Sequence, residues 1–249
     1  MEILKFRLNG KTAFFKNPEV NTYLYFSYGN IHKIAVLGIL GAILGLRGYN
    51  HQGSKDDYPE FYEKLKDTRI AIVPLNKGIF NKKIQFFNNS VGYASGEEGG
   101  NLIVKEEWLE NVDWEIYIFL DKSNIIQELK ERILNRKFKY NIYLGKNDHP
   151  ANIIEVEVLQ GKEIKNITSE IASLFIKGDA ICNNSDEIDD LFDEEEDWKP
   201  IFRYDEKLPY ALHKQSNQYL MKNFIFTNEK QIINGESFIK VNDKIIQLF

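Results

Sequence analysis

Two pairs of residues combine an imidazole with an ammonium group: His32 with Lys33, and His149 with Lys146. A metal-independent ribonuclease could be built from such a pair and a tyrosine, because the imidazole acts as general base and the cation stabilises the phosphorane. The same groups are common and also bind phosphate without cleaving it. The sequence therefore predicts anion binding without catalysis, with cleavage as the alternative.

The residues that usually bind metals are not spaced for a metal site. The chain has 4 histidines and a single cysteine, Cys182, and it contains no H-x-x-x-H, H-E-x-x-H or C-x-x-C spacing. One cysteine excludes an internal disulfide and a cysteine-cluster metal site. The sequence also lacks a G-x-S-x-G elbow and a Walker loop. We expect no metal and no cofactor.

An apolar, glycine-rich helix expected over residues 30–48 would position the first of these pairs. Asn30 is the expected N-cap and Gly48 the expected left-handed C-cap. From Ile34 to Leu46 no side chain is charged or polar. This stretch would be about 20 Å long, shorter than the bilayer core of about 30 Å. We therefore predict a buried helix and no membrane association.

The glycines of this helix need a reason, because each costs about 1 kcal/mol relative to alanine. Ala35, Gly38, Ala42 and Gly45 fall on one helix face, with Gly41 beside it. Such a smooth stripe lets another backbone or a sheet approach closely. Since large apolar side chains surround the stripe, we expect the helix to be packed nearly all round.

The first turn of the helix allows two interpretations. A lysine there is mildly unfavourable unless an anion lies nearby. One hypothesis is a phosphate site built from free N–H groups, Lys33 and His32. The alternative, favoured by the local pattern alone, is a solvated lysine beside a partly buried histidine whose hydrogen bonds are satisfied.

Composition indicates one large domain, or one domain with a substantial extension. The chain has 249 residues, with 43% hydrophobic and 13% aromatic residues, which is ample for a core. Its start, Met1 to Lys5, is strand-like and does not resemble a signal peptide. We expect a reducing, cytoplasmic compartment.

The negative net charge comes from one segment. The chain carries a net charge of −5, but residues 186–197 hold nine carboxylates and no basic residue. Without them, 28 acidic residues face 32 basic ones, a net charge of +4. The acidic run is predicted to be a solvated loop, with mimicry or repulsion of nucleic acid as the alternative. The rest of the chain is basic enough to hold a polyanion.

Hydrophobic periodicity predicts alternating strands and helices over the first 160 residues. The expected strands are 2–8 (continued or paired by 13–16), 68–74, 114–120 and 153–159. The expected helices are 30–48, 58–66 and 124–136. In the last helix, residues 125, 126, 129, 133 and 134 are expected to point inward. These strands and helices follow the split βαβ order. We predict an α+β fold: a ferredoxin-like βαββαβ domain over 1–160 and a β-rich extension over 161–249 that includes the acidic loop. Strand signals in the extension lie at 167–176, 219–226 and 238–249, the last a hairpin around Asn242.

A long excursion at about 75–107 is predicted to be an ordered hairpin arm. Strand-like runs at 84–87 and 101–105 flank a tip rich in Asn, Ser and Gly. Loops of this length in compact domains are usually functional or disordered. The arm interleaves cationic and aromatic residues, namely Lys77, Lys82, Lys83, Phe86, Phe87 and Tyr93. Single-stranded nucleic-acid surfaces have this composition.

Five segments form a distinctive combination: 6–15, 31–49 (I-H-K-I-A-V-L-G-I-L-G-A-I-L-G-L-R-G-Y), 86–95, 99–104 with Trp108, and 143–153. Together they resemble the Cas-five family of CRISPR-associated RAMP proteins, in its subtype I-B form. They spread over residues 2 to about 159, and the glycine-rich core of 31–49 is the most specific. Residues 31–33 replace a Pro-Pro-Arg segment of other subtypes, which supports the I-B assignment.

The resemblance implies a subunit of Cascade, the surveillance complex that carries a CRISPR RNA (crRNA). In that family the ferredoxin-like domain and a thumb-like hairpin clamp the 5′ handle of the crRNA. The protein also contacts the first backbone subunit and the large subunit near the PAM, and so reaches target DNA indirectly. Subtype I-B systems usually have a separate processing endonuclease, so binding without cleavage is expected. The alternative is metal-independent cleavage of pre-crRNA with tyrosine, lysine and histidine, as in subtype I-C relatives.

The candidate RNA-binding residues come from the arm and from the two imidazole–ammonium pairs. They are His32, Lys33, Lys82, Lys83, Asn88, Asn89, Ser90, Tyr93, Asn101, Lys146, Asn147 and His149. At the tip, the Asn and Ser side chains would bond displaced bases and the tyrosine would stack on one. The alternative is an exposed hairpin whose Asn and Gly residues only satisfy turn geometry.

Overall fold

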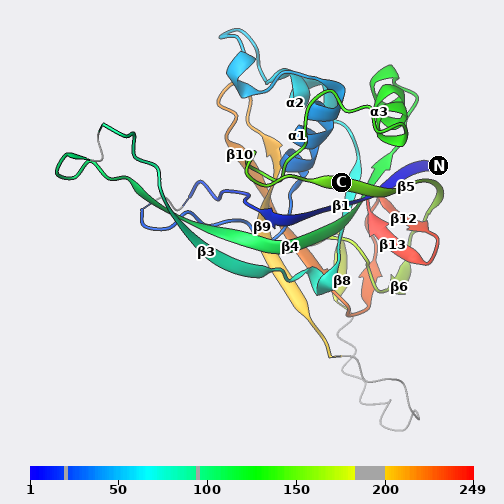
Figure 1. Ribbon diagram of the computed structural model, residues 1–249. Helices are drawn as coiled ribbons and strands as arrows, with labels where there is room; N and C mark the ends of the chain where they lie inside the picture. The colour runs from blue at the N-terminus through cyan, green and yellow to red at the C-terminus, as the bar shows by residue number, and fades with distance from the viewer. Residues whose placement is uncertain (20–21, 94–95, 183–199) are drawn as a thin grey trace.

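A seven-stranded antiparallel sheet forms the body of the protein (Figure 1). The computed structural model describes residues 1–19, 22–93, 96–182 and 200–249. The strand order is β13-β12-β5-β1-β4-β2, and β3 pairs with the outer part of β4. The strands are β1 (Glu2–Ala13), β2 (Ile70–Pro74), β3 (Asn81–Asn88), β4 (Ile103–Phe119), β5 (Asn152–Glu163), β12 (Phe238–Val241) and β13 (Lys244–Gln247).

The central strands lie in the order β5-β1-β4-β2, and strands and helices follow one another along the chain in the predicted split βαβ order. Helices α1 (Lys33–Leu44) and α2 (Glu60–Leu65) connect β1 to β2, and α3 (Asn124–Leu134) connects β4 to β5. All three lie on one side of the sheet (Figure 1). The fold is thus a β-rich α+β fold. The alternation of side chains along β1 explains why the helices cover one face of the sheet. Leu4, Phe6 and Leu8 point into the core under the helices, while Arg7 on the other face pairs with Asp113.

The C-terminal part of the chain completes this sheet. Strand β12 pairs with β5, and the backbone of Phe249 exchanges hydrogen bonds of 3.1 and 2.9 Å with Ile70 on β2, so the sheet nearly closes. The hairpin predicted around Asn242 is confirmed by the pairing of β12 with β13. The boundary predicted at residue 160, between the ferredoxin-like domain and the extension, stays a prediction. Strand β5 runs through this position. The acidic loop 186–197 lies outside the described residues.

Two three-stranded sheets form the rest of the C-terminal part that the structure describes. One contains β7 (Phe175–Ile176), β10 (Tyr219–Thr227) and β9 (Arg203–Leu212), and the other contains β6 (Ile167–Ser169), β11 (Gln231–Ile233) and β8 (Ala180–Cys182). Strand β9 was not predicted from the sequence. It packs against α1, where its Leu208 and Leu212 are buried in the main core.

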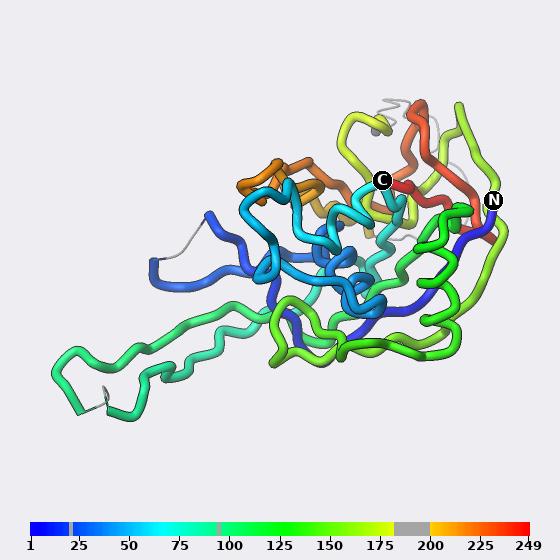
Figure 2. Tube along the Cα trace, turned by 90° about the horizontal axis from the view of Figure 1, so that it is seen from above, coloured from blue at the N-terminus to red at the C-terminus, as the bar shows by residue number. Residues whose placement is uncertain are grey.

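The predicted arm is an ordered hairpin that projects away from the body (Figures 1 and 2). Strand β3 pairs with the first half of β4, from Asn81 opposite Glu110 to Asn88 opposite Ile103. The sequence predicted separate strands at 101–105 and 114–120, but they are two ends of the single 17-residue strand β4. Its second half pairs with β1 and β2 in the body.

Helix α1 is shorter than predicted at both ends. It begins after His32, whose Nδ1 accepts a hydrogen bond of 3.3 Å from the Ala35 N–H, and ends at Gly45, which has a φ of 82°. The predicted caps Asn30 and Gly48 are therefore wrong. Asn30 is buried instead: it accepts a hydrogen bond of 3.0 Å from Trp114 Nε1 and donates one of 3.1 Å to the Gly78 carbonyl.

The small-residue stripe of α1 is closely packed at one edge and at its C-terminal end, and is open elsewhere. A Cβ at Gly41 would lie 2.7 Å from Phe61 Cβ, which confirms a close neighbour there. A Cβ at Gly38 would meet no atom within 4 Å. Ala35, Gly38 and Ala42 are only partly buried and face a cavity. The expectation that α1 is packed nearly all round is thus wrong on this face.

Helix α3 matches its prediction except at its end. Ile126, Leu129 and Ile133 are buried, but Leu134, which was predicted to point inward, is 42% exposed. The helix ends there, so its last residue rotates out of the apolar face. Within the described part of the chain, no helix is both long and apolar enough to cross a membrane.

His32 sits inside a ring of aromatic side chains. The ring edges of Phe15, Tyr28 and Tyr219 lie around it, with centroids 6.0, 5.5 and 5.6 Å away. Burial lowers the pKa of His32 to about 3, so the imidazole is neutral at physiological pH.

We expect Gly41→Leu to reduce the free energy of unfolding by about 1–3 kcal/mol, since the new side chain must displace Phe61. Denaturant unfolding measures this loss. Gly38→Ala is the control on the same helix and should be at least as stable as wild type, because its methyl meets no atom. Equal stability of the Gly41→Leu variant would show that this packing is not tight.

We also expect stability to fall as pH drops below about 6.5, because the unfolded chain takes up a proton that buried His32 does not. The loss is about 1.4 kcal/mol per pH unit for this group and ends near the folded pKa of about 3. His32→Asn keeps a capping oxygen but removes the titrating group. Urea unfolding of the two proteins at several pH values should give a shallower pH dependence for the variant. Parallel curves would contradict the buried, neutral state.

Candidate nucleic-acid interface

The arm presents its apolar and aromatic side chains to solvent. Tyr93 at the tip is 84% exposed, and Ile84, Phe86 and Ile103 along the ribbon are each more than half exposed. The predicted residues Lys82, Lys83, Asn88, Asn89 and Asn101 are also exposed. The arm therefore offers stacking faces and polar groups together, as the sequence predicted.

The polar side chains at the arm tip fall into two groups, those that shape the turn and those without a described hydrogen-bond partner. Asn88 Oδ1 accepts a hydrogen bond of 2.9 Å from the Ser90 N–H, and Ser90 Oγ accepts one from the Leu102 N–H. These two side chains shape the turn, as the structural alternative expected. No such bond holds the side chains of Asn89 and Asn101 within the described residues, so they are the polar groups that a ligand can use. Their predicted roles stay predictions.

A strap of chain before α1 fixes the root of the arm to the body. The Tyr25 N–H donates to the Lys105 carbonyl at 2.9 Å, and the Tyr25 carbonyl accepts from the Glu107 N–H at 2.9 Å. Lys16 Nζ lies 3.9 Å from the centroid of the Tyr25 ring. The arm root, the strap and the end of β1 therefore meet at one place.

Ion pairs decide which cations are available to a ligand. Lys146 Nζ lies 3.0 Å from both carboxylate oxygens of Glu106, and Lys82 Nζ lies 2.9 Å from Glu107 Oε1. Two predicted phosphate ligands are thus already paired with carboxylates. Lys83, which was predicted, has no carboxylate partner in the described parts of the chain. Nor does Lys16, which sequence reasoning missed.

The loop after Leu144 is held rigidly against the end of β1. A Cβ at Gly145 would lie 1.8 Å from the Phe14 carbonyl oxygen, and the φ of 89° there also requires glycine. His149 is fully buried; its Nδ1 lies 2.7 Å from Thr12 Oγ1, and its ring packs edge-on against Trp108 at 4.6 Å. His149 therefore positions the loop that carries Lys146 and the exposed Asn147.

The first imidazole–ammonium pair is also buried. The side chains of His32 and Lys33 are 5% and 6% exposed. Burial lowers the pKa of Lys33 to about 8, against an opposing effect of Asp67, and its Nζ lies 5.0 Å from the Tyr210 ring centroid. Neither side chain matches the local alternative, because the lysine is not solvated and the histidine is buried with a described hydrogen-bond partner only at Nδ1. Their predicted contact with RNA stays a prediction.

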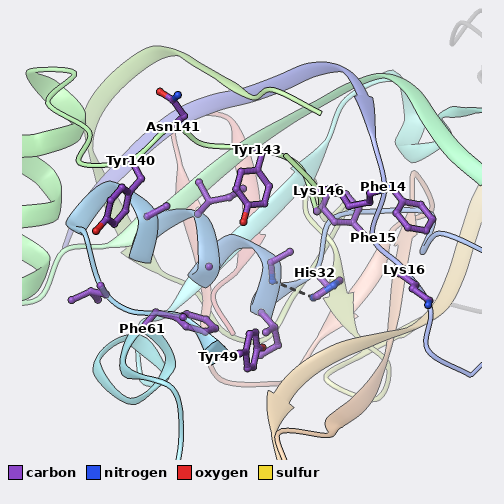
Figure 3. A pocket seen from close by; sticks show the side chains of 18 of the residues that line it. Phe14, Phe15, Lys16, His32, Tyr49, Phe61, Tyr140, Asn141, Tyr143 and Lys146 are labelled. Atoms are coloured by element: carbon purple, nitrogen blue, oxygen red, sulfur yellow. Dashed lines mark hydrogen bonds between the residues drawn. The ribbon is translucent and has the colours of Figure 1, made fainter. Parts of the chain in front are cut away.

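A cavity of about 770 Å³ opens beside α1, next to the arm root (Figure 3). We call it the α1 cavity. Its floor is the small-residue stripe of α1; Tyr49 and Phe61 lie on one side of the helix, and Tyr140 and Tyr143 on the other. The chain between α3 and β5 is fixed here because the Tyr140 N–H donates to the Ala42 carbonyl at 3.2 Å. Lys16, Arg47, Glu106 and Lys146 also line the cavity.

Sequence reasoning missed the tyrosines of this cavity. Tyr49, Tyr140 and Tyr143 come from two connecting segments with no regular spacing, so the only signal was the unexplained glycine stripe. The described residues contain no group of His, Cys, Asp and Glu side chains arranged to hold a metal ion.

Comparisons with known proteins give one family. Residues 3–219 match the family described as CRISPR-associated protein (Cas_Cas5). No curated protein matches the chain. A chain of a "CRISPR RNA-guided surveillance complex" is 10% identical, with 94% of each chain covered and a TM-score of 0.53. A CRISPR protein from Archaeoglobus fulgidus is 10% identical, with 99% of this chain and 98% of that one covered and a TM-score of 0.47. The first of these likenesses supports a shared fold, and the family match identifies this chain as a member of the Cas_Cas5 family of CRISPR-associated proteins.

Proposed function

We propose that this chain is a non-catalytic RNA-binding subunit of a type I-B CRISPR surveillance complex, where it holds the 5′ handle of the crRNA. The observation that carries the proposal is that aromatic and cationic groups are exposed on the arm, at its root and around the α1 cavity. The family match and the complex to which a chain of similar fold belongs support this role. The subtype rests on the resemblance of residues 31–49.

The chemistry of this surface suits a single strand. Exposed Tyr93 offers a ring on which a base can stack, and such stacking tolerates any base because every base has a π-face. Lys83 on the arm and Lys16 at its root carry charges that no described carboxylate neutralises. A groove that pairs phosphates with cations and bases with rings binds unpaired RNA.

The surroundings of both predicted general bases favour binding over cleavage. A general base must come within hydrogen-bond reach of the hydroxyl that it activates. His149 is fully buried, and burial lowers its pKa, with a further lowering by Lys146. His32 has its lone pair on Nδ1, which already accepts the Ala35 N–H at the N-cap of α1. Both imidazoles have structural tasks here, which supports a role without catalysis.

The outer face of the arm also suits a protein partner. Ile84, Phe86 and Ile103 are 51%, 56% and 54% exposed on a ribbon that projects from the body. Exposed apolar side chains gathered on one element mark protein contacts. We assign this face to the adjacent backbone subunit. The contact with the large subunit near the PAM, and through it with target DNA, rests on the sequence resemblance.

We expect Tyr93→Ala to weaken binding of single-stranded repeat RNA several-fold, since stacking is worth about 1–3 kcal/mol per base. Fluorescence anisotropy measures the affinity. The melting temperature should not change, because the ring is 84% exposed. Leu134→Ala on α3, also an exposed apolar side chain but remote from the arm, is the control. Unchanged affinity in both variants would contradict stacking at the tip.

Affinity should also fall linearly with the logarithm of salt concentration, by a slope of about −0.7 per phosphate contact. Lys83→Ala should reduce this slope by about one contact, whereas Lys82→Ala should change it less because Glu107 already pairs with Lys82. A salt-independent affinity would contradict phosphate binding.

Incubation of the full-length protein with repeat RNA in the absence of metal tests the alternative. We expect intact RNA on a denaturing gel. Cleavage at one position would establish the processing activity instead.

A further inference from the structure

We propose that the α1 cavity binds one unstacked nucleotide of the guide RNA, with its base among the tyrosines, its base edge at His32 and its phosphate at Lys16. The proposal rests on the proposed function and deepens it by assigning a site separate from the arm.

The cavity has the size and walls for a nucleobase. Its volume of about 770 Å³ lies within the range of about 300–1,000 Å³ that small-molecule sites occupy. Tyr49, Tyr140 and Tyr143 line it and are 45%, 55% and 45% exposed, so their rings are accessible. They approach α1 from opposite sides (Figure 3). A flat aromatic ring fits between such walls.

A donor without a described partner on the cavity wall supplies polar recognition. His32 Nδ1 accepts the Ala35 N–H, so the neutral imidazole carries its proton on Nε2. His32 is 5% exposed and lines the cavity, and Nε2 has no hydrogen-bond partner among the described residues. Nε2 is not one of the buried described atoms that lack a partner, so it is accessible from the cavity. A ring nitrogen or carbonyl oxygen of a base is the acceptor that this donor lacks.

The charges at the edge of the cavity select an anion. Lys146 is neutralised by Glu106, but Lys16 and Arg47 also line the cavity, and neither makes an ion pair with a described carboxylate. A nucleotide combines an aromatic ring with a phosphate and so uses both features. An apolar peptide would leave these cations and the His32 donor unused.

The same ligand explains why residue 38 is a glycine. Its φ is not in the left-handed region, and an added Cβ would meet no atom within 4 Å, so neither backbone geometry nor packing requires glycine. Glycine nevertheless weakens the helix. A residue without a side chain at this place keeps the floor of the cavity low enough for a ligand.

The test compares two substitutions at this one position. Gly38→Leu projects a side chain into the cavity, whereas Gly38→Ala adds only a methyl group. Both should melt at or above the wild-type temperature, because both raise helix propensity. With fluorescein-labelled repeat RNA, Gly38→Leu should weaken binding by about tenfold, the worth of one stacked base, and Gly38→Ala should leave it nearly unchanged.

Ultraviolet cross-linking and mass spectrometry then locate the occupant. We expect repeat RNA to cross-link to Tyr49, Tyr140 or Tyr143 in wild type and to lose these cross-links in Gly38→Leu. If Gly38→Leu binds RNA as wild type does and no cavity tyrosine is cross-linked, the cavity proposal is wrong and the proposed function stands. If wild-type protein binds no RNA, both fail. If AMP or UMP alone cross-links in the cavity while RNA cross-links elsewhere, the occupant is a free nucleotide and the proposal is overturned.

Discussion

The continuity of β4 is the constraint on which the rest of the structure depends. One 17-residue strand pairs with β1 and β2 in the body and with β3 in the arm. Its side chains also reach the helix layer, because Trp114 donates to Asn30 just before α1. A hairpin that shares a strand with the core keeps a fixed direction, so the arm has a fixed orientation relative to the α1 cavity.

The buried polar residues at the base of the arm serve this geometry. His149 fixes the loop that carries Lys146, and Glu106 on β4 receives the Lys146 ammonium, so the loop, the strand and the end of β1 form one unit. Buried ionic and hydrogen-bonding groups fix one arrangement of the chain, at a cost in desolvation. Here that order places exposed rings and unpaired cations along one surface, and this arrangement underlies the proposed hold on an unpaired RNA strand.

Much of the fold could be predicted from the sequence, and less of the site. Alternating and helical patterns predicted the central strands, α3 and the arm, because one buried face leaves a clear period. The same rules could not show that 101–105 and 114–120 are one strand, or that the stripe with Gly38 faces a cavity, since both depend on what lies across the sheet and the helix. Nor could they separate Lys82 from Lys83, because only the fold brings Glu107 to one of them. The tyrosines of the cavity come from irregular segments that carry no pattern.

The central claim is that one surface, from the arm to the α1 cavity, holds the RNA. Amide hydrogen exchange of the full-length protein with and without single-stranded repeat RNA tests it most directly, because every described segment reports in one experiment. The account predicts slower exchange with RNA in β3, the outer half of β4, residues 47–51 and residues 140–147, and no change in β6, β8 and β11. Protection confined to β6, β8 and β11, or no protection at all, would contradict it.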